Sequence, residues 1–347
     1  MNSIERFYAT VERKPVDRPA AWLGMPTTDA LPGLFDYYKV DSLHALKLAV
    51  GDDFYAVEVP YHSETASAIY AAFDWYRDGS DVDVEHRTLT TDGCFVDAEE
   101  LSDLDFFDWP DPEQYIDIAE CTRRINLAPP DKVALGMLWC CHFQDFCASF
   151  GMETALMNMA ANPEIVQAVD ARIMGFYLKA CKIFFEATKG KLNAVLIGDD
   201  LGSQQGLMIS PDMARKFVLP GAKQLVDLAH SYGLKVIYHS CGAISDIIED
   251  LIGIGVDIVH PIQAKAKGMS AAELKARFGD RVSFCGGVDT QDLLPNGTPE
   301  QVRETVRHLK SLFPTGLIIS PSHEAIQSDV PPANIFALFD EATKLNT

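Results

Sequence analysis

The stretch Lys235-Val236-Ile237-Tyr238-His239-Ser240-Cys241-Gly242 joins an apolar run to two potential metal ligands. Its first four residues have the length and composition of a buried strand. His239 and Cys241 follow where that strand ends, with one residue between them. Imidazole and thiolate are common zinc ligands, and two ligands this close on a strand-to-loop corner can point at one ion. The stretch therefore predicts a strand with a candidate metal site at its carboxyl end.

Short apolar runs of this kind occur eight times along the chain. The predicted strands are residues 20–25, 54–59, 133–139, 194–197, 235–238, 257–260, 282–284 and 317–319. The predicted helices are residues 112–126, 211–230, 244–254, 270–278, 299–312 and 334–344. Repeated strand–helix alternation is typical of a (β/α)8 barrel, so we predict an α/β fold of the TIM-barrel type. The alternative is an open, doubly wound sheet.

Residues 62–132 interrupt this alternation. The segment is acidic and contains Gly79, Pro110 and Pro112. We expect it to be an insertion after the second strand, with a hairpin around Gly79 and then the helix at 112–126. The whole chain, residues 1–347, is predicted to form a single domain that carries this insertion.

Composition narrows the function classes. The chain has 347 residues, 48% of them hydrophobic, and a formal net charge of −21. Such a negative charge argues against nucleic-acid partners and against anionic membrane surfaces. No apolar run reaches the ~20 residues that span a bilayer, and the N-terminus lacks a signal-peptide core, so we expect a cytoplasmic protein. The eight cysteines are then expected to be thiols, and they form no CxxC pair.

Polar residues gather where the predicted strands end. In a (β/α)8 barrel the active site lies at the carboxyl ends of the strands. This rule brings together residues from the second, third, fourth, sixth and seventh strand ends. The predicted substrate-binding residues are Tyr61, His62, Trp139, Gln204, Gln263 and Asp289.

Asp199 and Asp200 are the candidate acid–base residues, together with His239. Adjacent residues of an extended chain point to opposite faces, so one carboxylate can enter the pocket while the other binds backbone N–H groups. The carboxylate in the pocket would act as a general acid or base, or would anchor a ligand. The alternative is that both Asp residues only cap a helix or form a turn.

A zinc ion on His239 and Cys241 needs a third protein ligand, and we predict His323 at the end of the eighth strand. Zinc held in this way lowers the pKa of a further thiol and makes it a nucleophile at neutral pH. The alternative is that His239 merely ends a strand and Cys241 is a small buried residue.

Five segments together resemble the uroporphyrinogen decarboxylase superfamily. They are residues 198–204 (GDDLGSQ), 239–242 (HSCG), 255–263 (GVDIVHPIQ), 286–289 (GGVD) and 331–335 (PPANI). The resemblance extends over nearly the whole chain and implies the barrel fold, but it is not specific for one reaction.

Two branches of that superfamily differ at positions that can be compared with this sequence. The resemblance to true decarboxylases implies an Arg-rich segment after the first strand, which holds a substrate with eight carboxylates. Residues 24–30 read GMPTTDA and contain no arginine. A polyanion is electrostatically unfavourable in a chain of charge −21 without that cluster. His323, however, lies where such decarboxylases keep a histidine.

The second branch is that of the cobamide-dependent methyltransferases, to which this chain is also similar. That resemblance implies a His-x-Cys pair after the fifth strand, a further Cys near the eighth, and a zinc that activates a thiol. Here Ser322-His323 stands in place of the further Cys. We therefore expect a zinc-dependent methyltransferase that uses a small-molecule methyl donor or acceptor and a corrinoid protein as partner. The alternatives are a uroporphyrinogen decarboxylase and a non-catalytic barrel that binds a corrinoid or another ligand.

Overall fold

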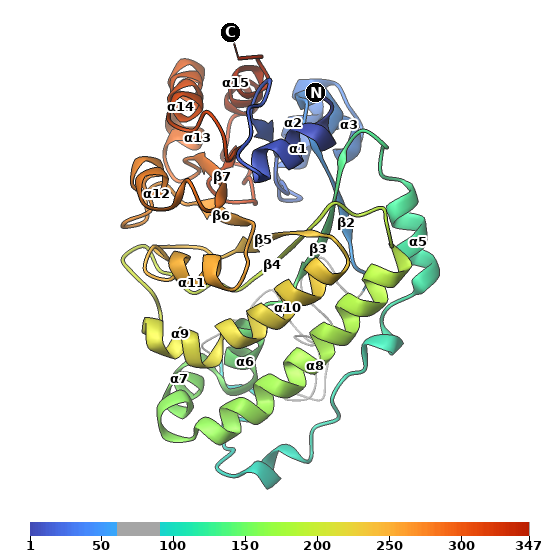
Figure 1. Cartoon of the computed structure of the whole chain (residues 1–347), viewed down its shortest axis with the longest axis vertical. Helices are drawn as coiled ribbons and strands as arrows, with labels where there is room; N and C mark the ends of the chain where they lie inside the picture. The colour runs from blue at the N-terminus through green and yellow to red at the C-terminus, as the bar shows by residue number, and fades with distance from the viewer. Residues whose placement is uncertain (61–90, 347) are drawn as a thin grey trace.

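Eight parallel strands form one curled sheet in the computed structural model, which describes residues 1–60 and 91–346. The order in the sheet is β1-β8-β7-β6-β5-β4-β3-β2. The strands are β1 Ala20–Ala21, β2 Phe54–Glu58, β3 Val133–Trp139, β4 Ala194–Gly198, β5 Lys235–His239, β6 Ile258–Ile262, β7 Ser283–Val288 and β8 Leu317–Pro321. All eight predicted strands are present, and the (β/α)8 barrel is confirmed (Figure 1).

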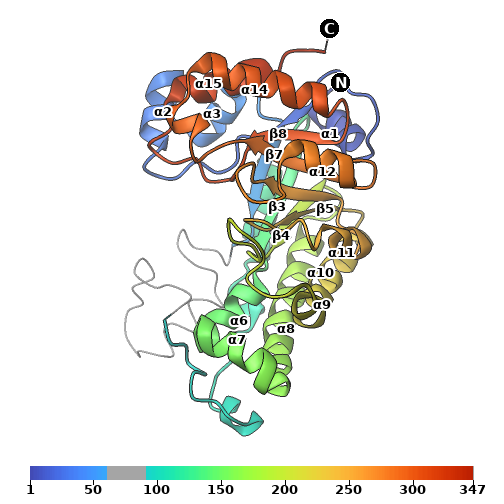
Figure 2. The same cartoon turned by 90° about the vertical axis from the view of Figure 1, so that its left-hand side faces the viewer.

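Helices cover the outside of the strands. They are α1 Ser3–Val11, α2 Leu31–Tyr38, α3 Leu43–Val50, α5 Ile118–Asn126, α6 His142–Phe150, α7 Met152–Ala161, α8 Pro163–Ala187, α9 Pro211–Phe217, α10 Leu219–Ser231, α11 Ile248–Gly253, α12 Ala271–Phe278, α13 Leu293–Asn296, α14 Pro299–Leu312 and α15 Pro332–Ala342. Figure 2 shows α14 and α15 together next to β7 and β8. None of the helices within residues 1–60 and 91–346 is long and apolar enough to cross a membrane.

Alternate strand residues divide the core into two layers. Leu135 and Met137 of β3 belong to a cluster with side chains of the other strands, and this cluster fills the barrel. Phe7 and Val11 of α1 join the same cluster and close the barrel at the amino ends of the strands. Leu138, which points the other way, packs in the outer layer between strands and helices. Strands buried on both faces explain the continuous apolar runs in the sequence.

Carboxylates close the seam between β1 and β2. Asp53 donates its N–H to the Ala21 carbonyl (2.9 Å) and accepts the Ala21 N–H through Oδ2 (2.9 Å). Asp52 accepts the Leu23 N–H (3.1 Å) and pairs with Lys47 (2.8 Å). Side chains thus replace the strand ladder at the seam, which is why β1 is shorter than the predicted strand at 20–25.

Two further differences from the sequence prediction lie at prolines. β6 continues through Pro261, where the predicted strand ended at residue 260. The pairing of β6 with β7 shifts register between Val259 and Ile262, so the missing N–H of Pro261 breaks no regular ladder. The predicted helix at 211–230 is two helices, α9 and α10, because Pro220 has no N–H to continue the first one.

The predicted helix at 244–254 is shorter than expected, since α11 begins at Ile248. Residues 242–247 form turns instead, in which Ala243 donates its N–H to the Ser203 carbonyl (2.7 Å). The predicted helix at 112–126 is present as a 3-10 turn, η3 Pro112–Gln114, followed by α5. These elements and η2 Leu101–Leu104 lie along α8 (Figure 1). The predicted hairpin around Gly79 lies outside the described residues.

The seam yields a first prediction. Asp53 is fully buried and holds Arg6 (2.9 Å) and Arg18 (2.7 Å). Asp53→Asn removes the charge that both buried guanidinium groups need, so we expect a loss of roughly 3–5 kcal/mol of unfolding free energy in urea titrations. The control is Asp36→Asn, whose partner Lys39 is equally solvent-exposed, and it should change stability by about 0.5 kcal/mol or less. Equal effects of the two substitutions would contradict this role of Asp53.

Candidate metal centre

The candidate centre lies at the carboxyl ends of β4, β5 and β6. His239 is the last residue of β5, and it stands opposite Gly198 of β4 and His260 of β6 in the sheet register. Asp200 and Cys241 follow β4 and β5 by two residues each. Parallel strands end at one edge of the barrel, so the register itself brings these side chains together.

Three ligand atoms converge around His239. Its Nε2 lies 3.4 Å from Sγ of Cys241 and 3.2 Å from Oδ1 of Asp200. Zinc bonds of about 2.0–2.3 Å in a tetrahedron place neighbouring ligand atoms about 3.3–3.6 Å apart. Imidazole, thiolate and carboxylate are all zinc ligands, so both the spacing and the chemistry of this set fit zinc.

The backbone of two loops fixes the spacing. Gly242 has φ +84°, and a Cβ there would lie 2.3 Å from the Gly202 carbonyl carbon. A Cβ on Gly202 would lie 2.6 Å from the Cys241 carbonyl oxygen. Only glycine permits this approach of the loops after β4 and β5. Asp200 and Cys241 are held further by a hydrogen bond from the Cys241 N–H to Oδ1 of Asp200 (2.9 Å).

Cys241 is not an activated thiolate on its own. Burial has the largest effect on Cys241 and raises the pKa of its thiol, and His239 offsets only part of that rise. A coordinating thiol loses its proton to a bound cation such as zinc. A bound metal ion, and not the side chains alone, would therefore be needed to hold Cys241 in its anionic form.

His239 and Asp200 form an ion pair in this structure. Burial disfavours both charges, but Glu324 and Asp200 outweigh it and raise the pKa of His239 well above its ordinary value. In turn His239 and the Cys241 N–H lower the pKa of Asp200 despite its burial. A metal ion at this place would replace the Nε2 proton of His239, so the charges of the site suit a cation.

His323 lies near the centre but outside the converging atoms. Its ring centre is 6.2 Å from that of His239. Its Nδ1 accepts the backbone N–H of Ala325 (3.0 Å), which leaves only Nε2 for a ligand. Among residues 1–60 and 91–346, Asp200 completes the candidate ligand set of His239 and Cys241, and a second set consists of His239, His260 and Glu324. Ligation by His323 stays a prediction.

Asp199 points away from the centre, as the alternation of an extended chain predicts. Its Oδ1 accepts the N–H groups of Phe143 (2.9 Å) and Gln144 (3.2 Å) at the start of α6. Its Oδ2 lies 3.3 Å from Nε2 of His142. The two adjacent carboxylates thus divide the tasks: Asp199 anchors α6, and Asp200 faces the candidate metal ligands.

Buried ionisable groups surround Asp199. Burial raises the pKa of Asp199 to about 7, and it raises the pKa of Asp145 to about 7 although Tyr177 donates a hydrogen bond to Asp145. Burial alone would lower the pKa of His142, but Asp199 and Asp170 outweigh it and raise that pKa to about 9. Groups with strongly shifted pKa values are common near functional sites, and here they lie against or within α6.

The predicted substrate-binding residues take different positions. Trp139 lies at the centre, with its ring 5.8 Å from that of His239. Trp139 and Cys140 have φ values of 61° and 55°, a strained backbone for non-glycine residues. Gln204 is exposed, and Asp289 accepts three backbone N–H groups at the start of α13. Tyr61 and His62 lie outside the described residues.

Gln263 connects the centre to a cavity. Its Oε1 accepts the Gly242 N–H, and its side chain also lines a space of about 400 Å³ at the barrel mouth. Amide, hydroxyl and imidazole groups and one carboxylate surround this space: Gln263, Thr290, Gln291, His323, Gln327 and Asp329, together with Ala325 and Val330. The described lining contains no Lys or Arg.

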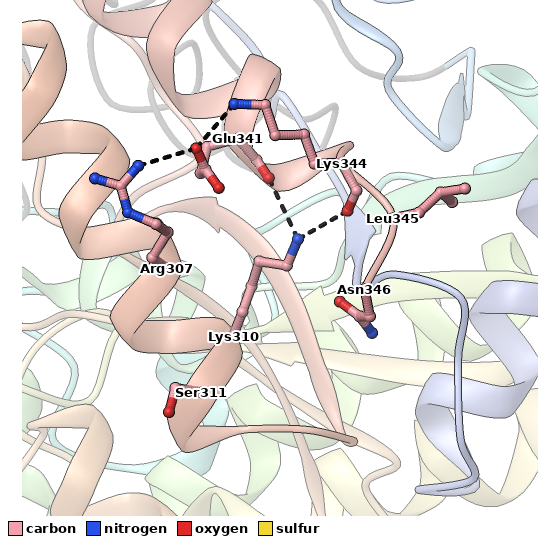
Figure 3. Close-up of a pocket in the computed structure, with 7 residues that line it drawn as sticks. All are labelled: Arg307, Lys310, Ser311, Glu341, Lys344, Leu345 and Asn346. Atoms are coloured by element: carbon pink, nitrogen blue, oxygen red, sulfur yellow. Dashed lines mark hydrogen bonds and ion pairs between the residues drawn. The ribbon is translucent and has the colours of Figure 1, made fainter.

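A second cavity, of about 720 Å³, lies at the opposite end of the barrel, between α14 and α15 (Figure 3). Lys310 reaches the carbonyls of Glu341 (3.4 Å) and Lys344 (2.8 Å) there. Lys344 and Arg307 both pair with Glu341. The two carbonyls lie at the end of α15 and just beyond it, so the cluster stabilises a helix end.

Fold and site together define a class: a (β/α)8 barrel with a cluster of side chains at the carboxyl edge of its strands that could hold a metal ion. The family described as uroporphyrinogen decarboxylase (URO-D) matches residues 91–345, and the chain belongs to this family.

Two relatives are methyltransferases of Methanosarcina mazei. The methylated-thiol–coenzyme M methyltransferase is 30% identical over 129 residues, which cover 35% of this chain and 32% of the relative. The match therefore spans about a third of that protein's length. A solved structure of a methyltransferase from the same organism matches 99% of this chain and 98% of its own, with a TM-score of 0.71 and 17% identity. The structural likeness supports the fold.

Two residues of the centre escaped the sequence analysis. The sequence indicated no role for His260 or for Glu324. The signal for His260 is its place in β6, since parallel register sets it beside His239. Glu324 follows β8 directly after His323 and lies 3.5 Å from Nδ1 of His239. That contact depends on the curl of the barrel, which brings the end of β8 opposite the end of β5, so it could be found only from the three-dimensional structure.

The buried Asp145 yields a second prediction. Its folded pKa of about 7 exceeds its ordinary value, so its ionisation costs stability as the pH rises from about 4 to 7. Asp145→Asn keeps an acceptor for Tyr177 and removes that cost. We expect its unfolding free energy relative to wild type to improve by roughly 2–3 kcal/mol between pH 5 and pH 8.

The control for this measurement is Asp131→Asn, at an exposed position. Its stability difference from wild type should not vary between the two pH values. A pH-independent difference for Asp145→Asn as well would show that Asp145 stays ionised throughout.

Proposed function

We propose that this protein is a zinc-dependent methyltransferase that works with a corrinoid protein. The observation that carries the proposal is the convergence of Nε2 of His239, Sγ of Cys241 and Oδ1 of Asp200. The two methyltransferases to which the chain is similar support the reaction type.

His239, Cys241 and Asp200 would hold the metal ion, and His323 is the candidate for a further ligand. When bound, zinc supplies a Lewis acid that lowers the pKa of a thiol, or polarises a methoxy- or methylamine-type donor. Asp200 compensates the positive charge and fixes the Cys241 loop through its hydrogen bond. Trp139 shields one side of the centre from water. The cavity beside Gln263 and His323 would receive the small-molecule methyl donor or acceptor.

The cavity disfavours the decarboxylase alternative. A porphyrinogen with eight carboxylates needs cationic partners, and the described lining offers none while Asp329 adds a negative charge. The thiolate-type ligand set has no role in a decarboxylation without metal. A non-catalytic corrinoid- or ligand-binding barrel stays as an alternative, and it differs from the proposal only in turnover.

Metal content is the direct test. Protein purified without added metal should contain about one zinc per chain, and Cys241→Ser should lose most of it because the thiolate ligand is gone. Cys141→Ser is the matched control, since Cys141 is also a partly buried thiol near this end of the barrel but belongs to no converging ligand set. It should retain zinc. Equal, negligible zinc in wild type and Cys241→Ser would refute the metal site.

Turnover separates the three functions. With methylcobalamin as methyl donor and 2-mercaptoethanol as acceptor, wild type and Cys141→Ser should demethylate the corrinoid, and Cys241→Ser should not. Chelation of the metal should abolish the reaction. Formation of coproporphyrinogen from uroporphyrinogen would instead identify a decarboxylase, and corrinoid binding without demethylation would identify the non-catalytic barrel.

A further inference from the structure

His239 uses both of its ring nitrogens inside the barrel mouth. Nε2 faces Cys241 and Asp200, and Nδ1 lies 2.9 Å from Nδ1 of His260. The His260 contact is the shortest that Nδ1 makes, since Oε2 of Glu324 is 3.5 Å away. A distance of 2.9 Å is that of a hydrogen bond, whereas 3.5 Å is too long for a strong one.

We propose that His260 is a positioning residue, which accepts the Nδ1–H of His239 and so keeps Nε2 free to bind a metal ion. This inference rests on the metal site of the proposed function. A neutral imidazole carries one proton, so metal binding at Nε2 requires the proton to stay on Nδ1. A histidine ligand is commonly fixed in this way by an acceptor at its other nitrogen. His260 supplies that acceptor.

The barrel holds the His260 ring in place. Residues 239 and 260 are register partners on neighbouring parallel strands, and the Ser240 N–H bonds to the His260 carbonyl (2.8 Å). The Trp22 ring of the segment after β1 packs against His260 in a T-shaped contact, with ring centres 5.2 Å apart. Backbone pairing on one side and an indole on the other leave the imidazole little freedom, so its Nδ1 is pre-oriented toward His239.

His260 also carries a cost that packing does not explain. It is fully buried, and its Nε2 has no hydrogen-bond partner among the described residues. An unsatisfied buried polar group costs about 1–3 kcal/mol, and the surrounding barrel interior is apolar. A leucine would fill such a site without that cost. The task of the opposite nitrogen, Nδ1, explains why an imidazole stands there.

Two substitutions separate the acceptor from the packing. His260→Leu removes the acceptor, and His260→Asn restores one, because the Asn Oδ1 occupies about the position of the histidine Nδ1. The readouts are zinc affinity by chelator competition and the visible spectrum of the Co²⁺-substituted protein, which reports thiolate ligation and geometry. We expect His260→Leu to lower zinc affinity roughly 10- to 100-fold, with an altered Co²⁺ spectrum, and to fold with unchanged or higher thermal stability. His260→Asn should recover most of the affinity and the wild-type spectrum.

Glu324→Gln is the control for charge. It removes the nearby carboxylate charge but leaves the His239–His260 hydrogen bond in place, so its zinc affinity should stay closer to wild type than that of His260→Leu. A folded His260→Leu that binds zinc as tightly as wild type would overturn the positioning role alone. A wild-type protein without zinc affinity would overturn the proposed function itself.

Discussion

The closure of the barrel depends on two buried carboxylates. Asp53, the residue before β2, forms one backbone hydrogen bond with Ala21 of β1, and the carboxylates of Asp52 and Asp53 accept two further N–H groups at the seam. Arg6, Arg18 and Lys47 neutralise these carboxylates. Without that closure β1 and β2, the two edge strands of the sheet order, would not meet, and β8 would not face β5 across the barrel mouth. The contact of Glu324 with His239, and the cavity between β6, β7 and β8, are consequences of this curl.

The register of the parallel strands then decides which side chains meet at the carboxyl edge of the barrel. Parallel pairing places Gly198, His239 and His260 side by side on neighbouring strands. The residues that follow them are therefore neighbours as well. Asp200 meets Cys241 because both stand two residues beyond adjacent strands. Nε2 of His239 faces Cys241 and Asp200, whereas Nδ1 faces His260 and Glu324, so the two nitrogens have different neighbours.

The sequence predicted the eight strands, their common carboxyl edge and the opposite directions of Asp199 and Asp200, because apolar runs and strand alternation are local properties. It could not predict the short β1, whose ladder is replaced by carboxylates from a distant segment. It did not reveal the roles of His260 and Glu324, since these depend on register and on barrel curvature. The pairing of His239 with Cys241 as candidate metal ligands followed from local spacing. The approach of Asp200 is a long-range property, and Asp200 rather than His323 lies nearest to this pair.

The mutual fit of Gly202 and Gly242 has a consequence for how this site can diversify. Because each glycine leaves no room for a Cβ on the other, the loops after β4 and β5 pack main chain against main chain. A different residue at position 200 or 241 would change the donor atom without disturbing this main-chain contact. Exchanging one of these side chains at a time would therefore shift the preference of the proposed metal site between harder and softer metal ions.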